Sequence, residues 1–511
     1  MKKTFRRVLS LTLSLIMAVA VFAPSFSVAA ANDLPIIYVI GKNSPIYNKD
    51  GKKIHPAGGI DTLIENNKDM LTRAFTLSIT APGGADWSIY SDAIYTMVCE
   101  YFKDFPLDNN GEISNGSYVK KNAEPKKKTS GFTLTDYYFY YDSRLDPFTN
   151  AKNLNTYINK VLSATGKKKV QLVGRCLGGT VVSAYLSKYG CDKVDTVLYY
   201  AAASQGVIPI SCFFAGDIAF DSDALKRYAT TDMDEEFSDL TKLMIKLASL
   251  TSTFNLGTQT VTSIYKNVAK TLYPRIVLAT YGTCPGYWSM VRDDYYEDAK
   301  KVVFGSATKK YANLITKIDN YHNKVFKKLP TILKNCQKKG MKIAIISKYN
   351  KAMPPLFTNC LKQADNLVEL ESASMGATCA NMEKTLTSAY ITYLENAGKD
   401  KYLSADLIVD ASSCAFPNYT WFVKNLGHET FPSAVNKLIM QIFGSTKQYT
   451  VNSNSKYPQF MDYDETTKKL SAVTKPDTTK DDPNKDTGFA AKLLAFFSTF
   501  MQIIRALLGI K

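Results

Sequence analysis

Histidine is scarce in this chain of 511 residues, which holds only His55, His322 and His428. Metal sites made from imidazole and thiolate need several ligands at close spacing, and the sequence has no such Cys/His cluster. We therefore expect neither a metal ion nor another cofactor. The same scarcity restricts catalysis, because a reaction that uses a histidine base must use one of these three.

The cysteine pattern and the charge pattern argue against a disulfide scaffold and a nucleic-acid-binding protein. The nine cysteines are scattered widely through the chain, which does not indicate a disulfide framework, although the eight other than Cys176 could pair. Several lie in apolar surroundings, where a thiol packs as a small hydrophobe. The formal net charge is +17, but the sequence has no nucleic-acid-binding motif and no basic run interleaved with aromatic residues. We expect no nucleic-acid partner.

The most informative stretch is Gly-Arg-Cys-Leu-Gly-Gly at positions 174–179. It follows an apolar run at 170–173, which predicts a strand, and precedes a segment at 180–186 that predicts a helix. A strand, a Gly-x-nucleophile-x-Gly turn and a helix form the nucleophile elbow of an α/β-hydrolase. Cys176 occupies the nucleophile position, where most such enzymes carry serine.

Chain order selects the partners of Cys176. In α/β-hydrolases the catalytic acid follows one late strand and the histidine follows the next. We expect these strands at 342–347 and 406–410, and only His428 follows the second. Asp365 is the first acid after the earlier strand, in a segment that resembles the acid loop of many lipases. His428 would accept the thiol proton and Asp365 would orient its ring.

Other residues remain candidates for parts of the site. Asp410, Glu369 and Glu371 are alternatives for the acid, although Asp410, at the end of an expected buried strand, is better suited to support the histidine loop through hydrogen bonds. His55 lies in a lysine-rich stretch and His322 on a basic helix, so we expect both at the surface.

Two segments before the elbow extend the pattern. An apolar strand at 34–41 ends in glycine, at the place where lipases carry an oxyanion-hole loop. The backbone N–H of Leu177 would supply one oxyanion donor, and the loop that contains Lys42 and Asn43 would supply the other. Further along, Tyr-Asp-Ser-Arg at 141–144 is followed by a predicted helix that leads to the elbow.

This order resembles the lecithin–cholesterol acyltransferase-like and related secreted lipase families, over roughly residues 34–203 and 340–440. The chain departs from their Tyr-Asp-Trp-Arg segment at Ser143, and from their serine at Cys176. Around its Gly-x-Cys-x-Gly box it is also similar to dienelactone hydrolases and polyhydroxyalkanoate synthases, which are cytoplasmic. The resemblance implies an α/β fold with a mostly parallel central sheet flanked by helices, and acyl-ester chemistry.

The N-terminus predicts export. Basic residues precede an apolar run, and small residues follow it, so residues 1–30 have the pattern of a cleavable signal peptide. The alternative, a permanent membrane anchor, fits the short apolar stretch less well. We expect a secreted or cell-surface protein.

The rest of the chain is expected to form a core in two parts, separated by a long insertion. We expect the hydrolase core in two parts, 31–204 and 339–465, because the interval 205–338 is too long for a connection. That interval has apolar periodicity and predicts a helical cap over the site; the alternative is a packing insertion that does not touch substrate.

The composition of the chain changes after residue 465. Residues 466–487 are polar and predict a linker, whereas 488–511 have a broad apolar face and predict an amphipathic helix. We expect this helix to contact an anionic membrane or the cell envelope, the alternative being that it packs back on the domain. Gln502 and Arg505 inside the apolar run argue against a membrane-spanning segment.

Together these features predict an exported α/β-hydrolase that acts on acyl esters, with lipids the favoured class. Cys176 would form an acyl thioester, which water or an alcohol would resolve. The competing hypothesis is a hydrolase-fold surface protein that is weak or inactive as a catalyst and has a binding role.

Overall fold

The computed structural model describes residues 32–41, 44–55, 60–82, 86–217, 267–268, 272–353 and 357–475. Several predictions fall outside these residues. They concern the signal peptide at 1–30, Lys42 and Asn43 of the oxyanion loop, much of the expected cap, the end of the linker and the C-terminal helix at 488–511.

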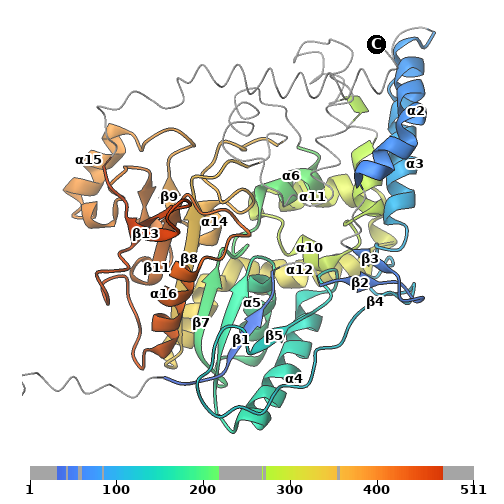
Figure 1. Ribbon diagram of the computed structural model, residues 1–511. Coiled ribbons are helices and arrows are strands. Elements are labelled where there is room, and N and C mark those ends of the chain that lie inside the picture. The colour runs from blue at the N-terminus through green and yellow to red at the C-terminus, as the bar shows by residue number, and fades with distance from the viewer. Residues whose placement is uncertain are drawn as a thin grey trace, which may run out of the picture.

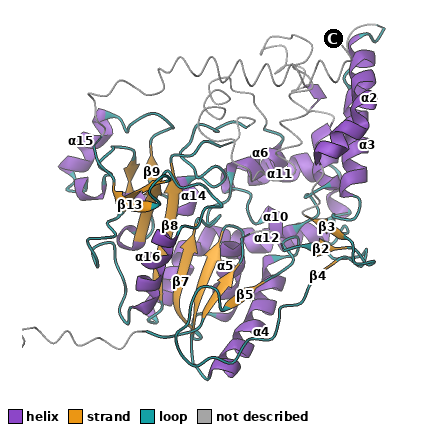
Figure 2. Ribbon diagram, viewed as in Figure 1, coloured by secondary structure: helices purple, strands orange, loops and turns teal. Residues whose placement is uncertain are grey.

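An eight-stranded sheet forms the centre of the molecule, as Figure 2 shows, with the order β13-β12-β11-β8-β7-β6-β1-β5. Every neighbouring pair is parallel except β12 and β13. The strands are β1 (Ile36–Val39), β5 (Tyr137–Phe139), β6 (Val170–Arg175), β7 (Val194–Tyr200), β8 (Lys342–Tyr349), β11 (Thr420–Lys424), β12 (Phe460–Asp464) and β13 (Lys469–Ala472). The predicted mostly parallel sheet is confirmed.

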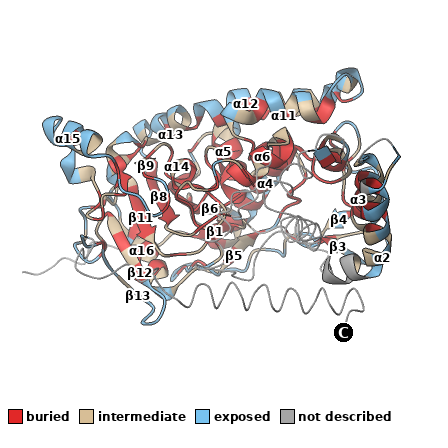
Figure 3. Cartoon of the chain, turned by 90° about the horizontal axis from the view of Figure 1, so that it is seen from above, coloured by how far each residue is buried: buried red, intermediate tan, exposed pale blue. Residues whose placement is uncertain are grey.

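Successive side chains of a strand point to opposite faces of the sheet, and in the central strands apolar residues occupy both sets of positions. Helices therefore cover both faces. Ile37 and Val39 of β1 pack toward α4 (Pro147–Thr165), α5 (Gly178–Tyr189) and α13 (Leu329–Lys338). Ile36 and Tyr38 pack toward α16 (Ser433–Gly444) on the opposite face. Seen from above, the buried strands lie between α5 and α13 on one side and α16 on the other (Figure 3).

One expected strand is wrong. Within 406–410 only β10 (Val409–Asp410) is extended, and it pairs with β9 (Thr378–Cys379) in a separate two-stranded sheet. Leu407 has a φ of +59°, which interrupts an extended conformation. The late strand that pairs with β8 in the central sheet is instead β11, whose apolar residues are buried. His428 follows β11 in the chain.

The expected cap does not end where the sequence suggested. The described part of 205–338 forms α6 (Ile208–Ala215), α10 (Pro285–Trp288), α11 (Asp293–Phe304), α12 (Ala312–Lys324) and α13. Tyr321 of α12, together with Leu329 and Leu333 of α13, is buried in the same apolar cluster as the sheet. Helix α13 therefore belongs to the layer that flanks the sheet, and α12 joins this layer at its C-terminal end, whereas its Leu314 and Ile318 belong to the other apolar cluster.

One further boundary differs from the prediction. Strand β13 lies inside the expected linker, because Asp464 accepts hydrogen bonds from the amides of Thr466 and Thr467 and turns the chain back along β12. A long insertion follows β1. It contains α2 (Ile60–Ile79), α3 (Ser88–Phe102) and a small sheet of β2 (Ile46–Tyr47), β3 (Lys53–His55) and β4 (Tyr118–Val119).

Two short helices remain, one beside the sheet and one at the end of the molecule away from α2 and α3. They are α14 (Leu370–Ala373), which contacts β8, and α15 (Ser388–Asn396), far from α2 and α3 in Figure 1. None of the helices in the described ranges is both long enough and apolar enough to cross a bilayer.

Two histidines that we expected at the surface are buried. His55 packs its ring 4.7 Å from that of Phe105, and burial lowers its pKa to about 4. His322 stacks on Tyr296 with ring centroids 3.6 Å apart, and its Nε2 lies 2.8 Å from Asp293 Oδ1. The aromatic partners come from other segments of the chain, so the polar local sequence did not reveal the burial.

Candidate active site

Cys176 lies at a sharp turn between β6 and α5. Its φ is +48°, in the left-handed region that non-glycine residues seldom adopt and that is often found at functional sites. The glycines around it are required by space. A Cβ on Gly178 would lie 2.4 Å from the carbonyl oxygen of Val39, and one on Gly179 would lie 2.7 Å from Ala202 Cβ. Strand, turn and helix thus have the geometry of a nucleophile elbow.

His428 and Asp365 meet beside this turn. His428 Nδ1 lies 2.8 Å from Asp365 Oδ2, and both side chains are buried. The other carboxylate oxygen accepts the amides of Leu367 at 3.2 Å and Val368 at 2.8 Å, which fixes the carboxylate plane. The contact expected between these two residues is present.

The histidine ring also interacts with the elbow. Burial alone would lower the pKa of His428, but the Asp365 carboxylate and then the Cys176 sulfur outweigh it and raise this pKa. Nε2 is buried and has no well-aligned hydrogen-bond partner among the described residues. The Cys176 sulfur is the group of the elbow that acts on this ring.

Asp365 is held in its ionised form. Burial acts to raise its pKa, but the neighbouring His428 and Lys348 reverse that effect and lower the pKa below its usual range. A buried carboxylate that stays charged can keep the facing ring nitrogen protonated and stabilise the imidazolium.

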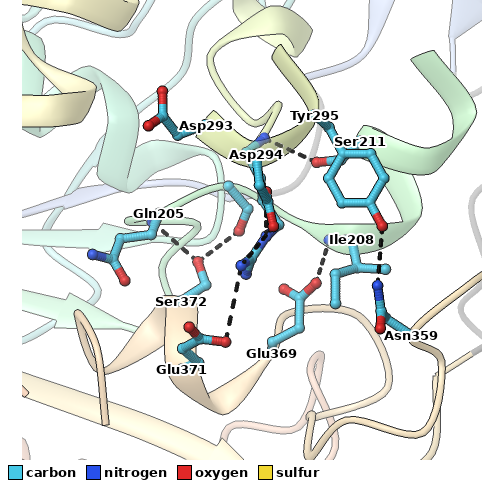
Figure 4. A network of polar contacts seen from close by, with 12 residues as sticks. Gln205, Ile208, Ser211, Asp293, Asp294, Tyr295, Asn359, Glu369, Glu371 and Ser372 are labelled. Atoms are coloured by element: carbon cyan, nitrogen blue, oxygen red, sulfur yellow. Dashed lines mark hydrogen bonds and ion pairs between the residues drawn. The ribbon is translucent and has the colours of Figure 1, made fainter. Parts of the chain in front are cut away.

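The alternative acids point elsewhere. Asp410 accepts hydrogen bonds from Tyr390 Oη at 2.9 Å and from the amide of Ser412, so it does not support the histidine loop as expected. Figure 4 shows Glu369 directed at the amide of Ile208, and Glu371 directed at a guanidinium, which is that of Arg292 at 3.9 Å. Glu369 is the N-cap residue of α14 and Glu371 lies within α14, and their side chains reach α6 and the N-cap of α11.

Leu177, one of the predicted oxyanion donors, lies at the start of α5. Leu177 is buried and is the N-cap residue of α5, so its N–H is one of the amides that a helix leaves without an intrahelical partner. Lys42 and Asn43 lie outside the described residues. Just before them, a Cβ on Gly41 would lie 2.6 Å from Cys176 Cβ, so the chain after β1 begins directly against the elbow.

Sequence reasoning missed the residues that hold the histidine loop, which we define as residues 427–430. Lys348, Arg175 and Tyr200 each donate a hydrogen bond to a carbonyl of this loop. A signal was present, since Lys348 interrupts the apolar run of a central strand. In the described part of the chain, no group of three or more histidine, cysteine, aspartate or glutamate side chains is placed to hold a metal ion.

Comparisons with known proteins give only distant likenesses. No protein-family model matches the chain, and neither does any curated protein. A solved Tle4–Tli4 complex has 10% identity over 62% of this chain and 75% of that chain, with a TM-score of 0.22. A meta-cleavage product hydrolase (CumD) has 11% identity over 80% and 92%, with a TM-score of 0.22.

A serine hydrolase from the polyaromatic hydrocarbon-degrading bacterium Cycloclasticus zankles has 13% identity over 39% of this chain and 54% of that one, with a TM-score of 0.13. Two of these three structures are thus named as hydrolases.

Proposed function

We propose that this chain is an α/β-hydrolase that acts on acyl esters through Cys176, His428 and Asp365, with lipids the favoured substrates. The observation that carries the proposal is the left-handed Cys176 at the end of β6, beside a buried His428 paired with Asp365 at 2.8 Å. A nucleophile, a base and a residue that orients the base are the three parts that covalent acyl chemistry requires.

In the first half-reaction, His428 Nε2 accepts the thiol proton and the Cys176 sulfur attacks the acyl carbon. The carbon–oxygen bond to the alcohol then breaks, and the imidazolium returns its proton to the departing oxygen. Asp365 holds Nδ1–H throughout and stabilises the imidazolium. The product is an acyl thioester on Cys176.

In the second half-reaction, water or an alcohol gives a proton to His428 and attacks the thioester carbon. The carbon–sulfur bond breaks, and the thiol regains its proton from the imidazolium. The amide of Leu177 and the loop with Lys42 and Asn43 would stabilise the oxyanion in both steps.

The preference for lipids rests on the surroundings of the elbow. Cys176 and Leu177 belong to one apolar cluster with Phe213 of α6, Tyr281 and Trp288. An apolar cluster that contains the nucleophile favours contact with a hydrocarbon chain over a polar acyl group. Export as a secreted or cell-surface protein, and contact of 488–511 with an anionic membrane, complete the proposal and rest on the sequence patterns.

Hydrolysis of p-nitrophenyl esters by the purified protein tests the proposal. We expect Cys176→Ala and His428→Ala to lose turnover, and iodoacetamide to inactivate the parent with its adduct on Cys176. Cys414→Ala is the matched control, because that buried thiol lies outside the site and burial raises its pKa to about 11. Unchanged turnover in Cys176→Ala would remove Cys176 from the mechanism.

A further inference from the structure

The histidine loop is tied to three neighbouring strands of the central sheet. Lys348, near the end of β8, donates from Nζ to the carbonyl oxygens of Gly427 at 2.6 Å and His428 at 2.7 Å. Arg175, the last residue of β6, donates from Nη2 to the His428 carbonyl oxygen at 3.1 Å. Parallel strands end at one edge of a sheet, so their last side chains converge on this loop.

Two further contacts complete the attachment. Arg175 forms an ion pair of 2.6 Å with Glu429, and Tyr200, the last residue of β7, donates its hydroxyl to the Thr430 carbonyl oxygen at 3.0 Å. Side chains at the ends of β6, β7 and β8 thus fix the positions of the loop carbonyls, while Asp365 fixes the imidazole ring.

Lys348 is the unusual member of this group because its side chain is completely buried. Burying an ammonium group is costly unless it is hydrogen-bonded and its charge is balanced. Here Nζ lies 4.0 Å from Asp365 Oδ2 and 4.9 Å from the centre of the Tyr200 ring. The cation therefore faces both the backbone that carries His428 and the carboxylate that orients it.

We propose that Lys348 is a positioning residue for the acyl chemistry: it fixes the backbone of His428 so that the imidazole lies between Asp365 and Cys176, and it balances the Asp365 charge. This inference rests on the proposed function. During turnover His428 alternates between imidazole and imidazolium, whereas Asp365 stays ionised. When the ring is neutral, Lys348 is the cation that remains close to the carboxylate.

The charge of Lys348 should make catalysis sensitive to alkaline pH. Burial lowers the pKa of Lys348 to about 8, although the Asp365 carboxylate acts in the opposite direction. The other charged or titratable groups that face it are Arg175 of β6, Tyr200 of β7, and Glu429 and Cys176. Below about pH 8 the ammonium is charged, and above it the charge is lost.

Three variants separate this role from simple packing. Lys348→Met keeps the length of the side chain but removes its donors and charge, whereas Lys348→Arg keeps both. Lys342→Met is the matched control, because Lys342 is a buried lysine at the other end of β8, where it donates to the Ser445 carbonyl oxygen and pairs with Asp195.

We expect Lys348→Met to lower kcat for p-nitrophenyl esters by about 100-fold with little change in KM, because a displaced base costs turnover rather than binding. Lys348→Arg should recover most of kcat and should keep its activity above about pH 8, where the parent declines. Equal kcat values in Lys348→Met and the parent, or an equal loss in Lys342→Met, would overturn the inference.

Amide hydrogen exchange gives a readout that needs no activity. We expect faster exchange in the histidine loop of Lys348→Met and unchanged exchange in Lys342→Met and Lys348→Arg. If the parent hydrolyses no ester, the proposed function fails, and the exchange comparison alone decides whether Lys348 fixes the loop. If Lys348→Met does not fold, the alkaline pH profiles of Lys348→Arg and the parent decide, and identical profiles would contradict the role.

Discussion

Asp365 and His428 are 63 positions apart in the chain, yet their side chains share a buried hydrogen bond of 2.8 Å. They meet because β8 and β11 are parallel neighbours, so the loops that follow these strands leave from the same edge of the sheet. The chain crosses from one loop to the other through α14, α15 and the small β9–β10 sheet. The fold therefore brings a carboxylate and an imidazole together at the elbow.

Replacing Asp365 by Asn should lower kcat for soluble esters by about 100- to 10,000-fold, because the amide neither stabilises the imidazolium nor selects the ring tautomer. Asp410→Asn is the control, since Asp410 is equally buried but pairs with Tyr390. Steady-state kinetics with p-nitrophenyl acetate measure both variants. A comparable loss of kcat in Asp410→Asn would contradict the assignment of Asp365 as the acid.

Glu369 should make the fold less stable as the pH rises. Its Oε2 is buried without a hydrogen-bond partner in the described part of the chain, and burial raises its pKa to about 7 although Arg292 acts against this. The unfolded value is roughly 4.3. A folded pKa above the unfolded one contributes stability that is complete below the unfolded pKa and is lost as the pH rises through about 7.

Glu369→Gln should remove that loss, which amounts to about 3 kcal/mol between pH 4 and pH 8 at 1.36 kcal/mol per pKa unit. Urea unfolding at both pH values measures the free energy of unfolding. Glu371→Gln, a half-buried neighbour paired with Lys362, should keep the pH dependence of the parent. Parallel curves for the parent and Glu369→Gln would contradict the prediction.

The features that the sequence predicted correctly depend on local pattern or on chain order. The strand, turn and helix around Cys176 can be recognised because they are contiguous, and the pairing of His428 with Asp365 can be recognised because few histidines compete for it. The catalytic roles of these residues stay predictions. The second late strand was misplaced because the turn at Leu407 interrupts an apolar segment, a backbone feature that hydrophobicity does not record.

Long-range contacts explain the other errors. His322 looks like a surface residue from its lysine-rich neighbours, but Tyr296 and Asp293 of α11 bury it. In the same way, Lys348 has no local partner, and its acceptors lie about 80 positions later. No pattern along the chain shows which carbonyls a buried lysine will reach.

Gly178→Ala should disrupt the elbow, because the new Cβ would lie 2.4 Å from the Val39 carbonyl oxygen and backbone cannot give way cheaply. We expect a destabilisation of roughly 1–3 kcal/mol and loss of esterase turnover. The matched control is Gly444→Ala at the end of α16, where a Cβ would meet nothing within 4 Å. Thermal unfolding and kinetics should therefore separate the two variants.

Truncation after residue 475 should leave hydrolysis of soluble esters intact, since the last strand of the sheet ends at Ala472. The removed residues include the apolar segment 488–511, whose large side chains would each contribute on the order of 1.5–3 kcal/mol if fully buried at an interface. Sedimentation with phosphatidylglycerol vesicles should be lost, with phosphatidylcholine vesicles as the control for charge. Equal sedimentation of both forms would exclude this segment as the membrane contact.

Arg144→Met should be the most destabilising of these substitutions. The guanidinium is completely buried and donates to both carboxylate oxygens of Asp142, at 3.0 and 2.7 Å, and to the carbonyl oxygen of Phe105 at 2.8 Å. Removing one partner of a buried pair leaves the other charge uncompensated, which costs about 3–5 kcal/mol.

The exposed pair of Arg275 with Asp92 provides the comparison. Arg275→Met should cost less than about 1 kcal/mol, because water screens and solvates an ion pair at the surface. Urea unfolding of both variants measures the difference. A loss in Arg144→Met as small as in Arg275→Met would show that the Asp142 carboxylate finds another partner, and that the segment between β5 and α4 does not depend on this pair.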